Sequence, residues 1–69
     1  MVAFATEYFE YNGSTLIFQL NNAINSIVSV DVNGLQEEEG SGFDVSGSQD
    51  IVLLGTPVVG SRIGVTYLY

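Results

Sequence analysis

The carboxylates are the residues of this sequence most capable of chemistry. Glu37, Glu38 and Glu39 form one run, and Asp31 and Asp44 lie on either side of it. Several carboxylate oxygens together suit a hard cation such as Ca²⁺. However, the run lacks the alternating Asp spacing of a calcium-binding loop, and consecutive residues of an extended chain point to opposite faces. We therefore expect no metal site and interpret the run as a solvated acidic loop that helps to keep the protein soluble.

Enzymatic chemistry is disfavoured by the side chains that are missing. Paired carboxylates can hydrolyse glycosides, but they need a cleft for which a small sandwich has little room. The chain has no Cys, no His and no Lys. It therefore has no Ser-His or Cys-His pair, no Schiff base and no P-loop lysine. We expect no enzymatic activity, no catalytic residue and no cofactor.

The charge balance limits the partners. Arg62 is the only basic side chain, and eight carboxylates give a formal net charge of -7. Each phosphate contact needs a cation, and an anionic membrane surface repels a protein of this charge. We therefore expect no nucleic acid and no membrane as partner. For Arg62 itself, we favour one local ion pair over a pair between subunits.

The length allows one small domain, residues 1–69. Since 46% of the residues are hydrophobic, the chain is not a disordered acidic tail. A domain of about 60 residues buries only about 60% of its unfolded surface and is marginally stable alone. Without Cys, disulfides and the usual zinc sites cannot stabilise it. Oligomerisation or docking onto a larger structure is therefore expected.

The first residues, beginning with Met1, lack the basic segment of a signal peptide, and no run approaches the roughly 18 apolar residues of a membrane-spanning helix. We expect a complete small protein that is made in the cytoplasm.

The residue types that must position these groups favour strands. Val, Ile, Thr, Phe and Tyr dominate the runs, and Gly, Asn and Ser separate them. Residues 2–11 and 14–20 flank Asn12-Gly13, the strongest two-residue hairpin signal, so a hairpin with Tyr11 opposite Ser14 is predicted. One face of this hairpin is the predicted core face, with Glu7 as its one polar exception; it holds Ala5, Phe9, Tyr11, Leu16, Phe18 and Leu20.

The opposite face of this hairpin carries three large apolar side chains, Phe4, Tyr8 and Ile17. A face in contact with water rarely holds such side chains close together. Either a loop or a second sheet covers them, or they form part of a subunit interface. Together with Tyr69 on the last predicted strand, they are the candidate interface residues.

A third strand is predicted over residues 26–32, with Val28, Val30 and Val32 inward and Ile27 on the other face. Asn33-Gly34 is a second turn signal. A tight hairpin at this turn would set Glu37 opposite Val30 on the core face, so a longer loop is predicted, with pairing resumed near Phe43.

The rest of the chain supplies one more hairpin and a last strand. Residues 43–45 and 50–54 are predicted to pair across residues 46–49. Residues 56–61 are predicted as a loop because Pro57 cannot donate to a central ladder. Residues 62–69 alternate as a strand.

About six short strands with frequent turns predict an all-β fold, a small antiparallel β-sandwich or partly open barrel. The sheet edges carry no Lys, which usually protects edges, so neighbouring subunits are expected to pair with or cover them.

From residue 26 onward the chain has a set of strand and turn motifs: Val30-Asp31-Val32-Asn33-Gly34, Phe43-Asp44-Val45-Ser46-Gly47, Asp50-Ile51-Val52-Leu53-Leu54, Pro57, Gly60 and Arg62-Ile63-Gly64-Val65-Thr66-Tyr67. With these residues the chain resembles small β-sandwich modules of bacteriophage virion proteins, found in tail fibres, baseplates and capsid decoration proteins. No functional residue carries over with this resemblance.

The resemblance implies a virion structural protein. The expected function is that of a capsid decoration (cement) subunit, which reinforces the head shell through contacts with the major capsid protein. Because such proteins are commonly trimers, the resemblance favours a homotrimer, located in the virion.

Two alternatives remain open. In a tail-fibre, head-fibre or host-recognition subunit, Tyr67, Tyr69 and an Asn-rich turn would bind a glycan or a surface protein. An acidic inhibitor would mimic nucleic acid. The charge suits such a mimic, but three of the eight carboxylates lie in one run and no strand presents a row of them.

Overall fold

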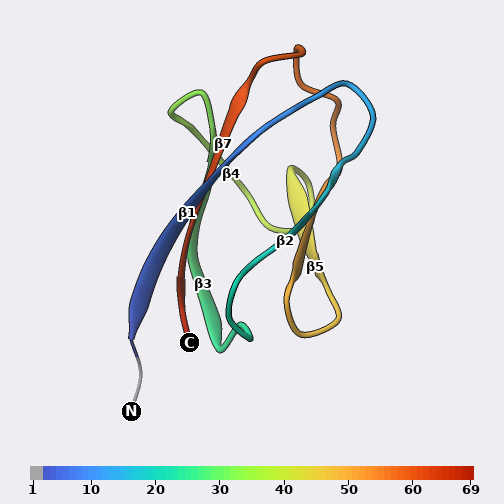
Figure 1. Ribbon diagram of the computed structural model, residues 1–69. Helices are drawn as coiled ribbons and strands as arrows, with labels where there is room; N and C mark the ends of the chain where they lie inside the picture. The colour runs from blue at the N-terminus through green and yellow to red at the C-terminus, as the bar shows by residue number, and fades with distance from the viewer. Residues whose placement is uncertain (1–2) are drawn as a thin grey trace.

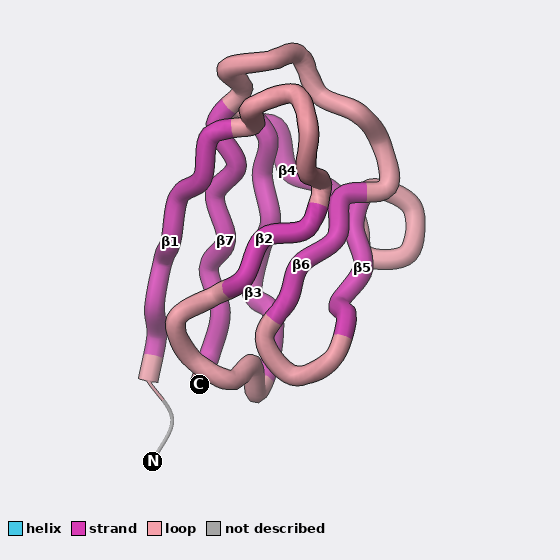
Figure 2. Tube along the Cα trace, turned by 45° about the vertical axis from the view of Figure 1, so that its right-hand side comes forward, coloured by secondary structure: helices cyan, strands magenta, loops and turns pink. Residues whose placement is uncertain are grey.

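The computed structural model describes residues 3–69, which form a sandwich of two antiparallel sheets (Figures 1 and 2). One sheet has the order β1-β7-β3-β4 and the other β2-β6-β5. The strands are β1 (Phe4–Glu10), β2 (Ile17–Gln19), β3 (Ser26–Val32), β4 (Leu35–Glu37), β5 (Phe43–Ser46), β6 (Asp50–Leu53) and β7 (Arg62–Leu68). The predicted all-β sandwich is confirmed, with seven strands and without closure into a barrel.

No helix occurs within residues 3–69, so this part of the chain has no helix able to cross a membrane. The predicted start of the first strand at Val2 lies outside the described residues.

The core lies between the two sheets and follows the alternation of the strands. Along β7, Ile63, Val65 and Tyr67 are fully buried, while Arg62 on the opposite face is exposed. The other buried apolar residues are Tyr11, Phe18, Leu20, Val30, Phe43, Ile51 and Leu53. Every residue of the predicted core face is either buried or packed against this cluster.

The predicted first hairpin is wrong. β1 pairs with β7 along its whole length and β2 pairs with β6, so residues 11–16 cross from one sheet to the other. Asn12 closes a local turn instead: its Oδ1 accepts the N–H groups of Ser14 at 2.9 Å and Thr15 at 3.3 Å. The inward side chains were still predicted correctly, because alternation specifies which side chains are buried and not which strand is the partner.

The second Asn-Gly pair does form the tight hairpin that the sequence analysis rejected. Asn33 and Gly34 both have positive φ angles, 52° and 87°, as a type I′ turn requires. Val30 faces Glu37 across the resulting β3–β4 pair. The carboxylate is tolerated because β4 is a three-residue edge strand and Glu37 is only half-buried.

A bulge in β3 corrects the prediction for Ile27 and Val28. Ile27 is paired with Tyr67 and Ser29 with Thr66, and these two partners are consecutive residues of β7. Val28 therefore has no partner residue on β7 and forms the bulge. Ile27 therefore packs against the core, and Val28 is exposed.

The C-terminal half matches its prediction. β5 and β6 pair with Val45 opposite Ile51, no strand is assigned to residues 54–61, and β7 begins at Arg62.

Candidate interaction surfaces

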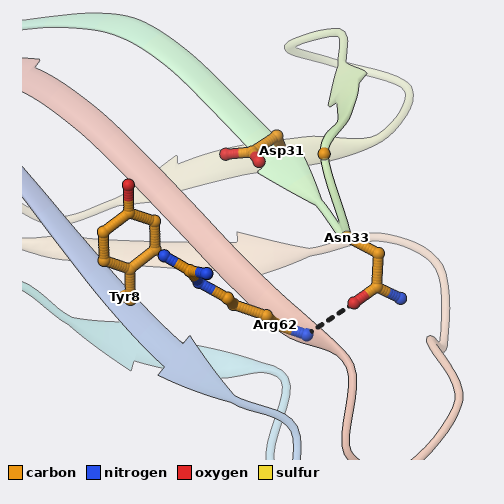
Figure 3. Close-up of a pocket in the computed structure, with 5 residues that line it drawn as sticks. Tyr8, Asp31, Asn33 and Arg62 are labelled. Atoms are coloured by element: carbon orange, nitrogen blue, oxygen red, sulfur yellow. Dashed lines mark hydrogen bonds between the residues drawn. The ribbon is translucent and has the colours of Figure 1, made fainter.

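A hollow of about 520 Å³ lies on the outer face of the four-stranded sheet, beside the Asn33-Gly34 turn (Figure 3). It is lined by Tyr8 of β1, Arg62 of β7, Asp31 of β3 and the two turn residues. Tyr8 and Asp31 come together because both face Gly64 of β7, one from each neighbouring strand.

Gly64 leaves the room for these side chains. A Cβ atom at this position would clash with Oδ1 of Asp31 and would lie 3.1 Å from Cε1 of Tyr8. Both side chains therefore lean over the backbone of β7, one from each side. A side chain at residue 64 would push them apart and change the shape of the hollow.

Arg62 packs against an aromatic ring. Its guanidinium carbon lies 3.9 Å from the ring centroid of Tyr8, a cation–π contact worth about 0.5–1 kcal/mol at an exposed site. Within residues 3–69 no carboxylate forms a salt bridge with Arg62, so the predicted local ion pair is not found there.

Asn33 fixes the start of β7 beside the hollow. Its Oδ1 accepts the Arg62 N–H at 2.9 Å, and its Nδ2 donates to Ser61 Oγ at 3.1 Å. The backbone N–H of Asn33 also donates to the Arg62 carbonyl at 2.8 Å. These hydrogen bonds from the turn residue Asn33 therefore fix the backbone of Arg62.

The hollow offers groups that can bind a polar ligand. Arg62 supplies N–H donors, Asp31 supplies acceptors, and Tyr8 supplies an aromatic ring and a hydroxyl. A polar group with both donors and acceptors, such as a sugar ring or a peptide end, matches this set.

The four predicted interface residues are all exposed, by 41–70%, but they do not form one surface. Phe4 and Tyr8 lie on the outer face of the four-stranded sheet, whereas Ile17 lies on β2 in the other sheet. Tyr69 follows β7 and packs its ring 5.9 Å from that of the buried Tyr67. The predicted grouping of Phe4, Tyr8 and Ile17 is wrong because β1 and β2 belong to different sheets. A role of each residue in assembly stays a prediction.

Glu7, the exception on the predicted core face, has a structural role. Its carboxylate accepts the hydroxyl of Tyr67 and the backbone N–H of Asn21, the latter at 3.1 and 3.2 Å from the two oxygens. Asn22 Nδ2 donates to the same hydroxyl at 3.1 Å. Burial, and then the hydrogen bond to Glu7, raise the pKa of Tyr67.

A second exposed surface was not predicted. Three aliphatic residues of the loop between β6 and β7 are exposed by 49–80%, and we call them the apolar loop end: Leu54, Val58 and Val59. The loop that carries them, between β6 and β7, extends to the end opposite the C-terminus in Figure 1.

Contacts between loops hold this end together. The Gly60 N–H donates to the Tyr11 carbonyl at 2.8 Å, and Val59 Cγ2 lies 3.2 Å from the place of a Cβ on Gly13. Residues 55–57 line a small hollow together with Val32 and Glu37. Residues 11–30 and 51–61 contain no charged side chain. The sequence feature that could have indicated this surface is the uncharged stretch of residues 51–61 with its aliphatic side chains.

The acidic run lies at the β4 side of the molecule. Glu37 ends β4, while Glu38 and Glu39 are exposed in the turn that leads to β5. Within residues 3–69 there is no group of three or more Asp or Glu side chains placed to hold a metal ion.

Comparisons with known proteins give no relative: no protein-family model, no curated protein and no solved structure matches this chain.

Proposed function

We propose that this chain is a structural subunit of a bacteriophage particle, specifically a capsid decoration protein that binds the major capsid protein and associates with further copies of itself. The resemblance of residues 30–67 to virion modules supports the assignment. The two-sheet sandwich that this resemblance implies is the observed architecture. The protein would act mechanically and catalyse no reaction.

The observation that carries the proposal is the apolar loop end. Aliphatic side chains exposed by 49–80% cost free energy in water, about 25 cal/mol for each Å² that a partner would bury. Since the loop residues are uncharged, burying them leaves no unpaired charge behind. Of the acidic run, Glu37 borders this loop in the small hollow, whereas Glu38 and Glu39 lie exposed in the turn after β4, where they can remain in water.

This placement of charge suits attachment to a shell. The loop end would bury apolar surface against the shell, while the acidic side of the sandwich stays solvated. By bridging several copies of the capsid protein, each subunit would add contacts that must break before the shell expands under internal DNA pressure.

The test is whether the protein is part of particles. Particles from cells that produce the protein are purified by density gradient, and the bound chain is quantified by mass spectrometry. We expect a stoichiometric copy number for the natural chain and loss of binding for a Val58→Ser/Val59→Ser variant. Val28→Ser is the control, since Val28 is exposed but lies on β3. Absence of the natural chain from purified particles would refute the proposal.

The hollow around Arg62 favours a second candidate, a host-recognition subunit. Its donors, acceptors and aromatic ring match the hydroxyl groups of a glycan. In this case an Arg62→Gln/Asp31→Asn variant should still join particles but should lose binding on a glycan array. If the variant and the natural chain bind glycans equally well, or if neither binds, this candidate is wrong.

The acidic inhibitor is the candidate that the arrangement of charges favours least. Glu7 points into the molecule, Asp31 lies on the outer face of the four-stranded sheet, and the acidic run begins at the end of β4 and continues into the turn after it. Attachment that depends on the loop end should persist at high salt, whereas binding of a nucleic-acid mimic to a basic protein should collapse.

A further inference from the structure

β1 is a long sheet edge without a partner strand. It stands at the end of the order β1-β7-β3-β4 and has seven residues, whereas the other edge strands, β2, β4 and β5, have three, three and four. In Figure 2, β1 forms one margin of the molecule, with β7 as its only neighbour in the sheet.

The hydrogen bonds to β7 identify which backbone groups of β1 are free. Ala3 and Tyr69 exchange two N–H···O=C bonds of 2.9 Å, and the Tyr11 N–H donates to the Ser61 carbonyl at 2.9 Å. Antiparallel pairs alternate, so the odd-numbered residues of β1 bond to β7. The N–H and C=O groups of the even-numbered residues point away from the sheet, and all four residues are exposed: Phe4, Thr6, Tyr8 and Glu10.

Most of the usual protections against strand pairing are missing on β1. The strand has no Lys, no Pro and no bulge, and its outer side chains include two exposed aromatic rings. Its two charged residues are Glu7, which is turned inward and hydrogen-bonded to Tyr67 and Asn21, and Glu10 at its end. The other edges differ: β4 continues into the acidic run, and the turn after it bonds back onto Phe43 at the start of β5. β1 is therefore the edge on which a further strand fits.

We propose that two copies of this chain pair through β1, antiparallel, around a two-fold axis at Thr6, so that the two four-stranded sheets become continuous. Only even-numbered residues have free groups, so even must face even. In this register Thr6 faces Thr6, and Phe4 of one copy faces Tyr8 of the other, which forms two aromatic cross-strand pairs on the outer face.

The charges of β1 count against an axis at Glu7, and the two Phe4–Tyr8 pairs favour Thr6 over the other residues of the strand. A register centred on Glu7 would set two Glu7 residues opposite each other, with Cα atoms about 4.5 Å apart. The Thr6 register sets Glu7 opposite Ala5 and leaves Glu10 outside the three facing pairs of the even-numbered residues. Each of these pairs exchanges two backbone hydrogen bonds.

The inference deepens the self-association in the proposed function, and it specifies a pair in place of the trimer that the resemblance favours. Each copy carries a net charge of -7, so the copies repel one another at low salt. The dimer should therefore be strengthened by salt, because salt screens this repulsion.

The first test is the native mass, measured by light scattering after size exclusion at low and high salt. We expect twice the 7.4 kDa chain mass, with a larger dimer fraction at high salt. Thr6→Pro removes an N–H that β7 does not use, and should give a folded monomer. Thr6→Val is the matched control: like Thr6→Pro it loses the 3.0 Å hydroxyl contact with Thr66, but it keeps the N–H and should remain dimeric.

The second test reads the register. Because the chain has no Cys, a single Thr6→Cys substitution can be oxidised without side products. Residues facing each other in a hydrogen-bonded pair have Cα atoms about 5.5 Å apart, within the range of a disulfide. We expect a covalent dimer for Thr6→Cys and none for Thr66→Cys, which lies one strand inward.

Several results would overturn the inference: a natural chain that is monomeric at every salt concentration, a trimer, or a Thr6→Pro variant that remains dimeric. If Thr6→Pro does not fold, Thr6→Glu replaces it, because two carboxylates at the axis should separate the copies without removing a backbone group. If a monomeric variant still binds particles, attachment to the capsid does not depend on pairing through β1. A dimer that is absent from particles would refute only the attachment.

Discussion

At the scale of single residues, Glu7 shows why an inward carboxylate is not an error in the alternation. Its carboxylate accepts hydrogen bonds from the buried hydroxyl of Tyr67 and from the backbone N–H of Asn21. The sequence analysis identified Glu7 as an exception on a correctly assigned face. It could not assign the partners, because Tyr67 lies 60 residues away in the sequence.

Replacing Tyr67 by Phe should remove the donor to Glu7. Because a hydrogen bond to a charged group contributes about 1.5–3 kcal/mol, we expect Tyr67→Phe to lower the free energy of unfolding by about this amount at pH 7. Urea denaturation followed by circular dichroism measures it. Tyr69→Phe is the control, since no side-chain hydrogen bond is assigned to Tyr69 among residues 3–69. Equal losses in both variants would contradict the role of Glu7.

The raised pKa of Tyr67 gives this contribution a pH dependence. The folded protein holds the phenol neutral at a pH where the unfolded chain, with a pKa of about 10, already ionises. The stabilisation is therefore complete below pH 10 and is lost as the pH rises through the higher pKa of the folded state. Denaturation between about pH 8 and 11 should show the natural chain losing stability relative to Tyr67→Phe. Parallel curves would contradict this.

Gly64 is the residue on which the shape of the hollow depends. In Gly64→Ala the new methyl group should displace Asp31 and Tyr8, both flexible at their ends, and separate Tyr8 from Arg62. We expect a change in unfolding free energy of about 1 kcal/mol or less. The upfield ring-current shift of the Arg62 side-chain protons, measured by NMR, should disappear as it does in Tyr8→Leu. A retained shift would show that Gly64 does not control the contact.

At the scale of elements, periodicity predicted faces and failed to predict partners. The sequence contains two Asn-Gly pairs of equal signal strength, and only the second turns a hairpin. At Asn12 the amide side chain bonds forward to Ser14 and Thr15, and the long β1 pairs with the equally long β7 instead. The residues of the turn cannot show whether β1 pairs with β2 or with β7, because β7 lies at the other end of the chain.

The bulge in β3 leads to a prediction about deletions. Removing Val28 joins Ile27 to Ser29, and their partners Tyr67 and Thr66 are already consecutive. The deletion should therefore keep both halves of the β3–β7 register, and the protein should fold. Deleting Thr66 should turn Tyr67 outward and prevent folding. Two-dimensional amide NMR spectra of both variants test this; an unfolded Val28 deletion would show that the bulge itself is required.

At the scale of the whole molecule, the sequence predicted the sandwich architecture and the absence of Lys from the sheet edges. Both predictions follow from the composition and from the alternation of apolar and polar residues. The apolar loop end could not be predicted, since a loop sequence does not show which of its aliphatic side chains the fold leaves exposed. Ile17 was wrongly grouped with Phe4 because β1 and β2 belong to different sheets.

The uneven charge of the molecule predicts how it responds to acid. The sequence isoelectric point is about 4.1, so the net charge shrinks as the pH falls from 7 toward 4. Since repulsion between copies declines with it, self-association should increase and solubility should pass through a minimum near pH 4. Turbidity and light scattering between pH 7 and 3 test this. Solubility that is constant across this range would contradict the prediction.

The central position of β7 has a consequence for the synthesis of the protein. The ribosome makes β7 after every other strand, yet β1 and β3 both pair with it. Until Arg62 and the residues after it have been made, β1 has no partner strand. Such long-range pairing is slow to form. The last strand therefore sets the time at which the sandwich can close, and chaperones that act on nascent chains would meet it open.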